Sequence, residues 1–538
     1  MMAQAKQLHR KLAASAGWGA AIATVTSLGV APPVIAGDRH WNAATGFWSQ
    51  IANWNPAAVP GPADHAIIDY FGAGSAGNAR INTTAIGAVT AVTVLNGGTV
   101  TISNQGSLLC GTDFVLGTGS TQGTLNVLTT NPNLTFPGGI TIVTDLRLGV
   151  SSGVGLVTQD AGTVTVGRNL IIGDSNTAGS IFTGVGTYNL AGTGVLKVPT
   201  IKVATSSTTG TLSVSGFAKL NTDSLTIQAG ATGPAGHLRQ TGGQVNVAGY
   251  TTLQSSAFNS GSATYNLSGG TLTTSGFQIN DRCVFNFTGG SASVTTLRMA
   301  NGRVFMSSGG NKFLRVYDLN LFYESVIDVN DNSMIMTDYF QFQSQLRGAI
   351  RLGYNSGAWN GKFIASTTAA NNPQHNTALG YAAVWDIMPP PTSGGYMFQG
   401  QPVNGSDVIV TYTYYGDTDL NGIVDFDDYS RIDSGFNNGG TDWFHGDFDY
   451  NGIVDFDDYS LIDLAFNTQS GTLRRAMAYL DGSDRSDVGM DRPAVQLVQR
   501  HFHQFGEAYS ASFLNAVPEP SVGFLLFATL LFRRRRIS

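Results

Sequence analysis

Cysteine, glutamate and charge of either sign are scarce in this chain. Among its 538 residues 12% are charged, the formal net charge is −6, and glutamate occurs only at Glu324, Glu507 and Glu519. Without a basic excess, the composition argues against a nucleic-acid partner. The two cysteines, Cys110 and Cys283, are far apart and lie in no zinc-ligand spacing. We therefore expect two small core residues, and a disulfide between them stays open.

Glycine, by contrast, is abundant, and it punctuates short alternating segments. The chain has 68 glycines, and its Thr, Ser and Val suit strands and turns better than helices. From about residue 90 to 320, glycines precede segments such as GGTVTI (97–102), GGQVNV (242–247) and GGSASV (289–294). Their irregular period predicts stacked coils that bury one continuous core. A series of β-sandwiches is the alternative, and it would need clearer hairpins.

The fold class that we predict is mainly β. Its body is a right-handed parallel β-helix or solenoid-like stack, and a small α-helical module follows it. The evidence for the module is a segment that occurs twice, as GDTDLNGIVDFDDYSRIDSGF (416–436) and GDFDYNGIVDFDDYSLIDLAF (446–466). The copies are 30 residues apart (446 − 416), are identical at 16 of 21 positions and keep every acidic residue.

The acidic spacing is that of a calcium loop. Ca²⁺ takes about 6–8 oxygens, and a twelve-residue loop supplies them from positions 1, 3, 5, 7, 9 and 12, with glycine at position 6. We predict two Ca²⁺ ions, held by Asp417, Asp419, Asn421, the Ile423 carbonyl, Asp425 and Asp428, and by Asp447, Asp449, Asn451, the Ile453 carbonyl, Asp455 and Asp458. The alternative is an acidic turn without metal, which mutual repulsion of the carboxylates disfavours. Position 12 is Asp, where an EF-hand usually has Glu.

Each loop continues into an apolar helical stripe, and a strand-like segment (408–415) precedes the first loop. Two such half-hands in tandem resemble the type I dockerin module, over about 52 residues (416–467). Because such short helices need their apolar stripes packed together, we expect a pseudo-twofold pair in which Ile423, Tyr429 and Ile432 pack against Ile453, Tyr459 and Ile462. In dockerins that bind a cohesin, loop positions 10 and 11 are usually small hydroxyl residues. Here they are Phe-Asp in both copies (426–427 and 456–457). A cohesin-like partner therefore does not follow. The alternative is that calcium only stabilises the fold of the module and that the module has no partner.

Both ends of the chain carry targeting patterns. Basic residues at Lys6, Arg10 and Lys11 precede an apolar stretch (12–30) and small residues up to Ala36. This pattern predicts a signal peptide over residues 1–36, with a membrane anchor as the alternative. At the other end, a Pro-Glu-Pro motif (518–520) precedes a 12-residue apolar run (521–532) and four arginines (533–536). A run of this length spans about 18 Å, less than the roughly 30 Å of a bilayer core.

This second pattern resembles the PEP-CTERM sorting signal. The resemblance implies transient anchoring in the inner membrane of a Gram-negative bacterium and cleavage by an exosortase. We therefore expect an exported protein at the cell surface or in the extracellular space. The domains that we predict are a signal peptide (1–36), an N-terminal cap (37–90), solenoid repeats (91–320), a C-terminal β cap (321–412), the dockerin-like module (413–469), a linker with an amphipathic helix (470–516) and the sorting signal (517–538).

Two further hypotheses concern the N-terminal region and catalysis. Trp41, Trp48 and Trp54 either cap the open end of the first coil or form a sugar-stacking platform. Many β-helices cleave polysaccharides, but glycoside hydrolysis usually needs two paired carboxyl groups. The few aspartates between residues 90 and 310 are scattered, so we expect no enzyme.

Our first hypothesis is a structural or binding protein of the surface or matrix. The alternatives are a dockerin-bearing component of a polysaccharide-degrading assembly, which gives a polysaccharide partner, and a carbohydrate-active β-helix enzyme.

Overall fold

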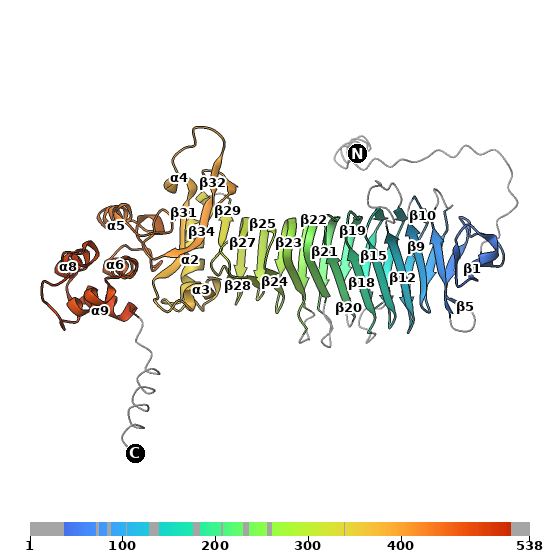
Figure 1. Cartoon of the computed structure of the whole chain (residues 1–538), viewed down its shortest axis with the longest axis horizontal. Coiled ribbons are helices and arrows are strands. Elements are labelled where there is room, and N and C mark those ends of the chain that lie inside the picture. Colours follow the sequence, from blue (N-terminus) through green and yellow to red (C-terminus); the bar gives the residue numbers. More distant parts are fainter. Residues whose placement is uncertain are drawn as a thin grey trace, which may run out of the picture. The chain divides into compact units, whose positions relative to one another are not determined.

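The computed structural model describes residues 37–71, 75–82, 88–103, 105–128, 139–175, 183–205, 208–229, 236–255, 261–337 and 339–517. The predicted signal peptide and the Pro-Glu-Pro motif, apolar run and arginines of the predicted sorting signal lie outside these residues. The described chain is mainly β, as predicted, and most of its strands belong to one sheet in which parallel pairing dominates (Figure 1).

Three series of parallel pairings run through this sheet. The first joins β4 (His65–Ile68), β8 (Ala91–Val94), β11 (Phe114–Thr118), β14 (Asp145–Val150) and β17 (Asn169–Asp174). The second joins β7 (Asn78–Ile81), β9 (Gly98–Ser103), β12 (Gln122–Leu128), β15 (Val154–Gln159), β18 (Val185–Leu190) and β20 (Thr209–Val214). The third joins β10 (Ser107–Cys110), β13 (Gly139–Ile142) and β16 (Thr163–Val166).

Longer strands carry these series onward, because each takes part in two or three of them. They are β19 (Val195–Val203), β21 (Lys219–Gln228), β22 (Gly236–Gln254), β23 (Thr264–Ile279), β25 (Ser291–Ala300) and β27 (Phe313–Phe322). The second series also continues through β24 (Val284–Phe287), β26 (Arg303–Met306), β28 (Val326–Asp328) and β30 (Phe363–Ala365). Parallel pairing thus begins before residue 91 and ends after residue 320.

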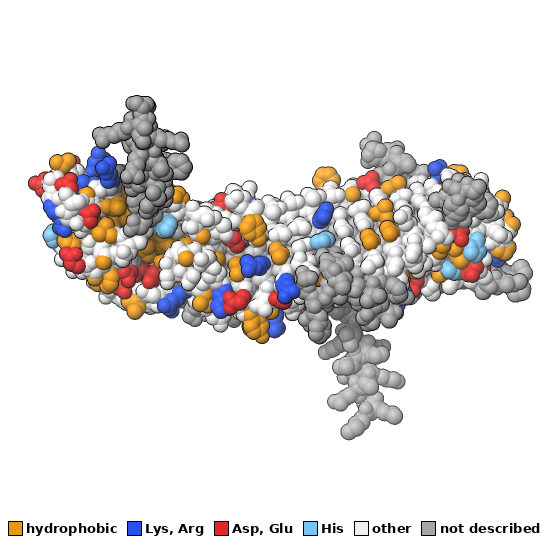
Figure 2. All heavy atoms as spheres, turned by 90° about the horizontal axis from the view of Figure 1, so that it is seen from below, with side chains coloured by type: hydrophobic (Ala, Val, Ile, Leu, Met, Phe, Trp, Pro, Cys, Tyr) orange, Lys and Arg blue, Asp and Glu red, His pale blue; other side chains and the backbone are white. Residues whose placement is uncertain are grey.

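The core lies where the inward side chains of successive strands stack. Val100, Leu125, Val157 and Tyr188 are register partners in turn, and each is fully buried. Their outward neighbours are mostly neutral polar residues, which gives the alternation typical of a half-buried strand. The Tyr188 hydroxyl donates to Gln159 Oε1 at 2.6 Å, so this buried polar group has its partner. The view in Figure 2 shows few charged side chains along the middle of the strand region.

The N-terminal strands hold the three tryptophans in the core. These strands are β1 (Asp38–Trp41), β2 (Thr45–Phe47) and β3 (Trp54–Asn55), and the short helix η1 (Ile51–Asn53) lies between β2 and β3. The strand pair β5 (Tyr70–Phe71) and β6 (Ser75–Ala76) follows later in the chain. Trp41, Trp48 and Trp54 are at most 1% exposed. Trp54 meets the rings of the other two edge to face, at 5.0 and 4.7 Å. A sugar cannot stack on buried rings, so the sugar-platform hypothesis is wrong and the rings serve the core.

The parallel series end at antiparallel strands and a helix. β29 (Ser333–Met336) pairs antiparallel with β34 (Val408–Tyr414), which in turn pairs with β31 (Thr377–Ala383). The region predicted as a β cap also contains helices, of which α2 is the longest. Besides the antiparallel strands, the elements of this region are α2 (Tyr339–Tyr354), α3 (Thr367–Ala370), α4 (Val384–Ile387), β32 (Tyr396–Phe398) and β33 (Gln401–Val403).

Helices make up the rest of the described chain (Figure 1). They are α5 (Phe426–Asn438), η2 (Trp443–His445), α6 (Phe456–Gln469), α7 (Leu473–Leu480), α8 (Pro493–Phe505) and α9 (Glu507–Ala516). The expected linker after residue 470 therefore contains α7. Arg492 is the N-cap of α8. Cys110 and Cys283 are free and buried, as expected of core residues, and burial raises the pKa of each thiol to about 11.

Candidate metal centres

The two copies of the repeated segment form two acidic clusters. The first copy follows β34 directly, so its loop begins at the end of the sheet and runs into α5. The second loop runs into α6 in the same way. In each loop three carboxylates come together, with one oxygen of each within 4.8 Å of the others: Asp417, Asp419 and Asp428 in the first, and Asp447, Asp449 and Asp458 in the second. Either cluster could hold a metal ion.

Glycine at position 6 allows each loop to turn back on its first aspartate. Gly422 and Gly452 have φ values of 93° and 91°, in the left-handed region that favours glycine. Their amides donate to Asp417 Oδ2 at 2.9 Å and to Asp447 Oδ2 at 3.0 Å. The loop backbone therefore fixes the position 1 carboxylate before any ion binds.

The predicted ligand at position 9 does not join either cluster. Asp425 is the N-cap of α5, where its Oδ1 accepts from the Asp427 amide at 2.9 Å, and Asp455 does the same for α6. Each N-cap amide in turn donates to the position 12 carboxylate, Asp428 or Asp458. This capping box satisfies amides that the first turn of a helix leaves unpaired.

Position 5 is also engaged within its own loop. The side-chain oxygens of Asn421 and Asn451 accept from the amides of Ile423 and Ile453 at 2.9 and 2.7 Å. The two isoleucine side chains are 53% and 61% exposed, so the expectation that they pack between the helices is wrong. The reason is their place in the loop, because α5 and α6 begin three residues later.

Burial raises the pKa of five of the six clustered carboxyls. For Asp417 and Asp447 burial is the main cause, the neighbouring carboxylate adds to it, and both pKa values rise to about 7 from a usual 3.8. The same cause raises the pKa of Asp428, Asp449 and Asp458. At Asp417 or Asp447 the difference is on the order of 4 kcal/mol against the ionised form. A divalent cation would remove this cost by neutralising the site.

One ligand oxygen of the second cluster is left without a partner. Asp447 is fully buried, and no described residue gives its Oδ1 a hydrogen bond. Buried acceptors are almost always satisfied, and an exception needs a cause such as an ion. The first cluster differs, because Arg431 Nη1 lies 3.3 Å from Asp419 Oδ2 and 3.4 Å from Asp428 Oδ1. Leu461 takes this position in the second copy.

The two copies pack through reciprocal contacts. A Cβ on Gly416 would lie 2.3 Å from Cγ1 of Ile462, and one on Gly446 would lie 2.7 Å from Cγ1 of Ile432. Since Gly446 and Ile462 each lie 30 residues after Gly416 and Ile432, the contacts follow a pseudo-twofold relation. Ile432 and Ile462 are fully buried, and Tyr429 and Tyr459 are buried beside them, as expected.

A second reciprocal pair, which the sequence analysis missed, involves aspartates inside the helices. Tyr429 donates to Asp463 Oδ1 at 2.5 Å, and Tyr459 donates to Asp433 Oδ1 at 2.6 Å. A signal was present, because both copies carry an aspartate on the helix four residues after the tyrosine. Nothing in the local pattern shows that each tyrosine reaches the aspartate of the other copy.

Asp463 also joins the C-terminal helices to the repeated pair. Its Oδ2 accepts from the Tyr509 hydroxyl on α9 at 2.5 Å and lies 2.6 Å from Nδ1 of His501 on α8. Asp463 is fully buried and His501 is 3% exposed. The amphipathic helix therefore packs on the module, and His503 takes no part in this contact.

The pair of repeated segments packs directly against the sheet. A Cβ on Gly380 of β31 would lie 2.8 Å from Nε1 of Trp443, and the Tyr450 hydroxyl donates to the Leu379 carbonyl of β31 at 2.9 Å. Tyr450 is fully buried, with its ring 5.3 Å from that of Tyr354 on α2. An isolated 416–467 segment would expose these rings, so we expect that it does not fold fully without the sheet and α2.

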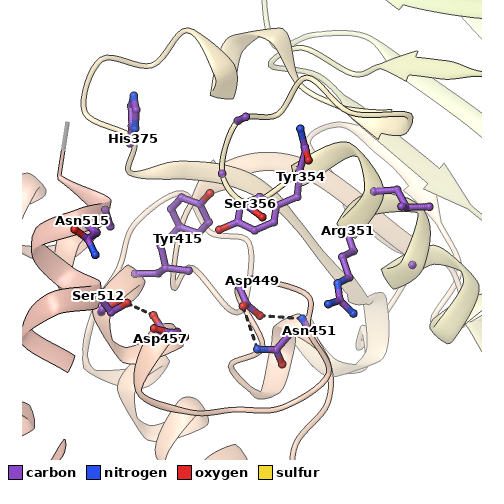
Figure 3. Close-up of a pocket in the computed structure, with 18 residues that line it drawn as sticks. Arg351, Tyr354, Ser356, His375, Tyr415, Asp449, Asn451, Asp457, Ser512 and Asn515 are labelled. Carbon is purple, nitrogen blue, oxygen red and sulfur yellow. Dashed lines mark hydrogen bonds between the residues drawn. The ribbon is translucent and has the colours of Figure 1, made fainter. Parts of the chain in front are cut away.

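A pocket of about 970 Å³ opens beside the second cluster (Figure 3). Asp449 and Asn451 line one side of it, Tyr354 and Tyr415 lie near its centre, and the exposed His375 lies at the far side. The Asp449 side chain is held there by Asn451, whose Nδ2 donates to it at 3.0 Å. The second loop thus has a solvent-accessible side, through which an ion can enter.

Together, the fold and these loops define a mainly β protein with two acidic loops able to hold metal. Searches of protein-family models, of curated proteins and of solved structures found no match to this chain. In the part of the chain that the structure describes, no helix has both the length and the apolar character needed to cross a membrane.

Proposed function

We propose that this chain is an exported surface or matrix protein, structural or binding rather than enzymatic, whose C-terminal module is stabilised by two Ca²⁺ ions. The observation that carries the calcium assignment is the buried, unpartnered Oδ1 of Asp447 beside Asp449 and Asp458. An all-oxygen donor set suits a hard cation such as Ca²⁺. The triads of clustered carboxylates are the first ligands, and the sets expected from the sequence are complete only if Asp425 and Asp455 share their helix-capping role with the ion.

The body is proposed to be a right-handed parallel β-helix. Three parallel series support this, because strands such as β22 pass from one series to the next within one element. In the first series, the register partners Phe114 and Leu146 are 32 residues apart (146 − 114), and Phe277 and Leu297 are 20 residues apart (297 − 277). Each separation is the length of one coil. Right-handed crossovers are the rule for parallel strands. Such a stack suits a structural role, because every coil buries its neighbour's apolar edge.

Export and anchoring rest on the sequence patterns of the two ends. The basic and apolar N-terminus supports secretion, and the motif at 518–520 with its apolar run and arginines supports cleavage by an exosortase at the inner membrane. Mass spectrometry of culture and envelope fractions tests this. We expect no peptide from before residue 37 or from the arginine cluster. Recovery of intact 533–536 in the exported protein would contradict it.

Limited proteolysis of the whole chain tests the calcium-stabilised module. With Ca²⁺ we expect residues 416–516 to resist cleavage, because the ions hold loops whose carboxylates otherwise repel one another. With a chelator we expect cuts at the exposed Ile423 and Ile453, mapped by mass spectrometry. The same cleavage pattern in both conditions would reject calcium as a stabiliser.

A second candidate is docking into a polysaccharide-degrading assembly through a cohesin-like partner. Exposed apolar side chains around the loops favour it: Ile423 and Ile453, already described, and Phe426, which is 58% exposed. A pull-down from the extracellular fraction, with and without calcium, separates the candidates. A calcium-dependent partner that no longer binds the Phe426→Ser variant supports docking. If calcium only stabilises the module, no such partner is expected.

A further inference from the structure

A second pocket, none of whose lining residues belongs to either acidic loop, lies where the loop that follows α3 meets β34. Its volume is about 490 Å³, within the roughly 300–1,000 Å³ range of small-molecule sites. The lining consists of four asparagines, three threonines, one glutamine, one proline and two tyrosines. None of these side chains is charged at neutral pH, so neither an anion nor a cation finds a counter-charge among them.

The two tyrosines give the pocket one aromatic wall. Tyr412 and Tyr414 are two residues apart on β34, so they lie on the same face of the strand. Both are half-buried, and Tyr414 pairs across the sheet with Thr377 of β31. The Tyr412 hydroxyl is protonated at neutral pH, as in any tyrosine, and burial raises its pKa further. Tyrosine combines an apolar ring face with a polar tip, and such a ring can contact the C–H face of a sugar.

The amides of the loop are held in place before any ligand arrives. Asn372 Nδ2 donates to Asn376 Oδ1 at 2.7 Å and to Thr377 Oγ1 at 2.6 Å. Asn372 Oδ1 accepts from the backbone N–H of Gln374 at 3.0 Å. A fixed network of this kind lowers the entropy lost on binding.

One further amide remains available to a ligand. Asn371 is exposed at the end of α3, and its side chain makes no hydrogen bond with any described residue. A primary amide offers two donors and an acceptor, which match neighbouring hydroxyls. The pocket therefore combines an aromatic wall, preorganised neutral amides and a free amide.

From this combination we propose that the pocket binds a neutral saccharide. A polyhydroxylated ring without charge can form hydrogen bonds with the free amide of Asn371 through its hydroxyls and can contact the tyrosines through its C–H face. The inference does not rest on calcium binding, because no lining residue belongs to either acidic loop. It adds a ligand class to the proposed surface role.

Isothermal titration of the whole chain, in buffer with calcium, tests the proposal. The probes are four neutral hexasaccharides, built of glucose in β-1,4 linkage, glucose in α-1,4 linkage, mannose and N-acetylglucosamine, and one acidic hexasaccharide of galacturonate. The variants are Tyr414→Ala and Asn371→Ala. Tyr250→Ala is the matched control, because Tyr250 is 55% exposed on β22 and outside the pocket.

We expect one or more neutral hexasaccharides to bind, and both pocket variants to weaken that binding tenfold or more while the control leaves it unchanged. Asn371→Ala keeps the test valid if Tyr414→Ala disturbs the strand, because the Asn371 side chain supports no other group. Failure of all neutral probes to bind, a preference for galacturonate, or equal binding by Asn371→Ala would each overturn the proposal.

Discussion

Tyr429 on α5 donates a 2.5 Å hydrogen bond to the buried carboxylate of Asp463 on α6. The same carboxylate meets Tyr509 and His501 of the two C-terminal helices. Four helices therefore converge on one charged group. The reciprocal bond, from Tyr459 to Asp433, lacks these extra partners and lies nearer the surface. The two copies are alike in sequence, but only the aspartate of the second copy also binds the C-terminal helices.

This inequality predicts different costs for two matched substitutions. Asp463→Ala leaves two buried hydroxyls and one imidazole without an acceptor, and we expect it to lower the free energy of unfolding by about 3 kcal/mol or more. Asp433→Ala loses one bond at a partly exposed site, and we expect about 1 kcal/mol. Urea titration of the helical circular dichroism signal, with calcium present, measures both. Equal losses would show that the C-terminal helices do not depend on Asp463.

A second prediction separates backbone strain from steric contact. Gly446 has a φ of 107° and packs on Ile432, whereas Gly439 has a φ of 72° and open space, with no atom within 4 Å, where a Cβ would stand. Gly439→Ala should cost about 1 kcal/mol for the left-handed backbone alone. Gly446→Ala should cost about 2 kcal/mol or more, because the isoleucine must also move. Equal effects in the same titration would argue against tight packing between the copies.

The third prediction concerns Arg431, which lies against the first acidic cluster. Calcium must displace or share the carboxylates that this guanidinium contacts, so the first loop should bind more weakly than the second. Arg431→Leu copies the second loop and should tighten the first site by about 1 kcal/mol, roughly fivefold. Leu461→Arg should weaken the second site in return. Calcium titration of both variants checks this, and unchanged affinities would mean that Arg431 does not oppose binding.

The fourth prediction is that chelation unfolds helices and spares strands. The acidic loops end in α5 and α6, and α8 and α9 pack on α6 through Asp463 and Ser460. The strands of the body bury aliphatic side chains far from any acidic loop. Circular dichroism with and without a chelator should therefore show a loss of helix and a retained strand signal. An unchanged helical signal would contradict the coupling.

Much of this arrangement could be predicted from the sequence, for identifiable reasons. The strands around Gly98 and Ser291 follow from glycine-bounded alternation, a local pattern, and the acidic triads follow from spacing within one loop. The place of Asp463 could not be predicted, because its partners lie 34, 38 and 46 residues away along the chain. Helix α2 was missed because its aromatic and polar residues resemble a strand-rich cap.

The exposed Ile423 and Ile453 illustrate a different limit. Their apolar character continues the helical stripe in sequence, so periodicity alone assigns them to the core. Helix capping by Asp425 and Asp455 decides otherwise, because it starts each helix only after the loop. The predicted packing was therefore correct for Tyr429, Ile432 and their counterparts in the second copy, and wrong for the two loop isoleucines.

Calcium titration of the whole purified chain tests the central claim most directly. After chelation and removal of the chelator, isothermal titration should show two Ca²⁺ ions per chain. Asp417→Ala and Asp447→Ala should each remove one site and weaken the other, because the two helices share one core. The whole chain is required, since Tyr450 and Trp443 are buried against the sheet and α2. No heat of binding, or two ions still bound by Asp447→Ala, would contradict the account.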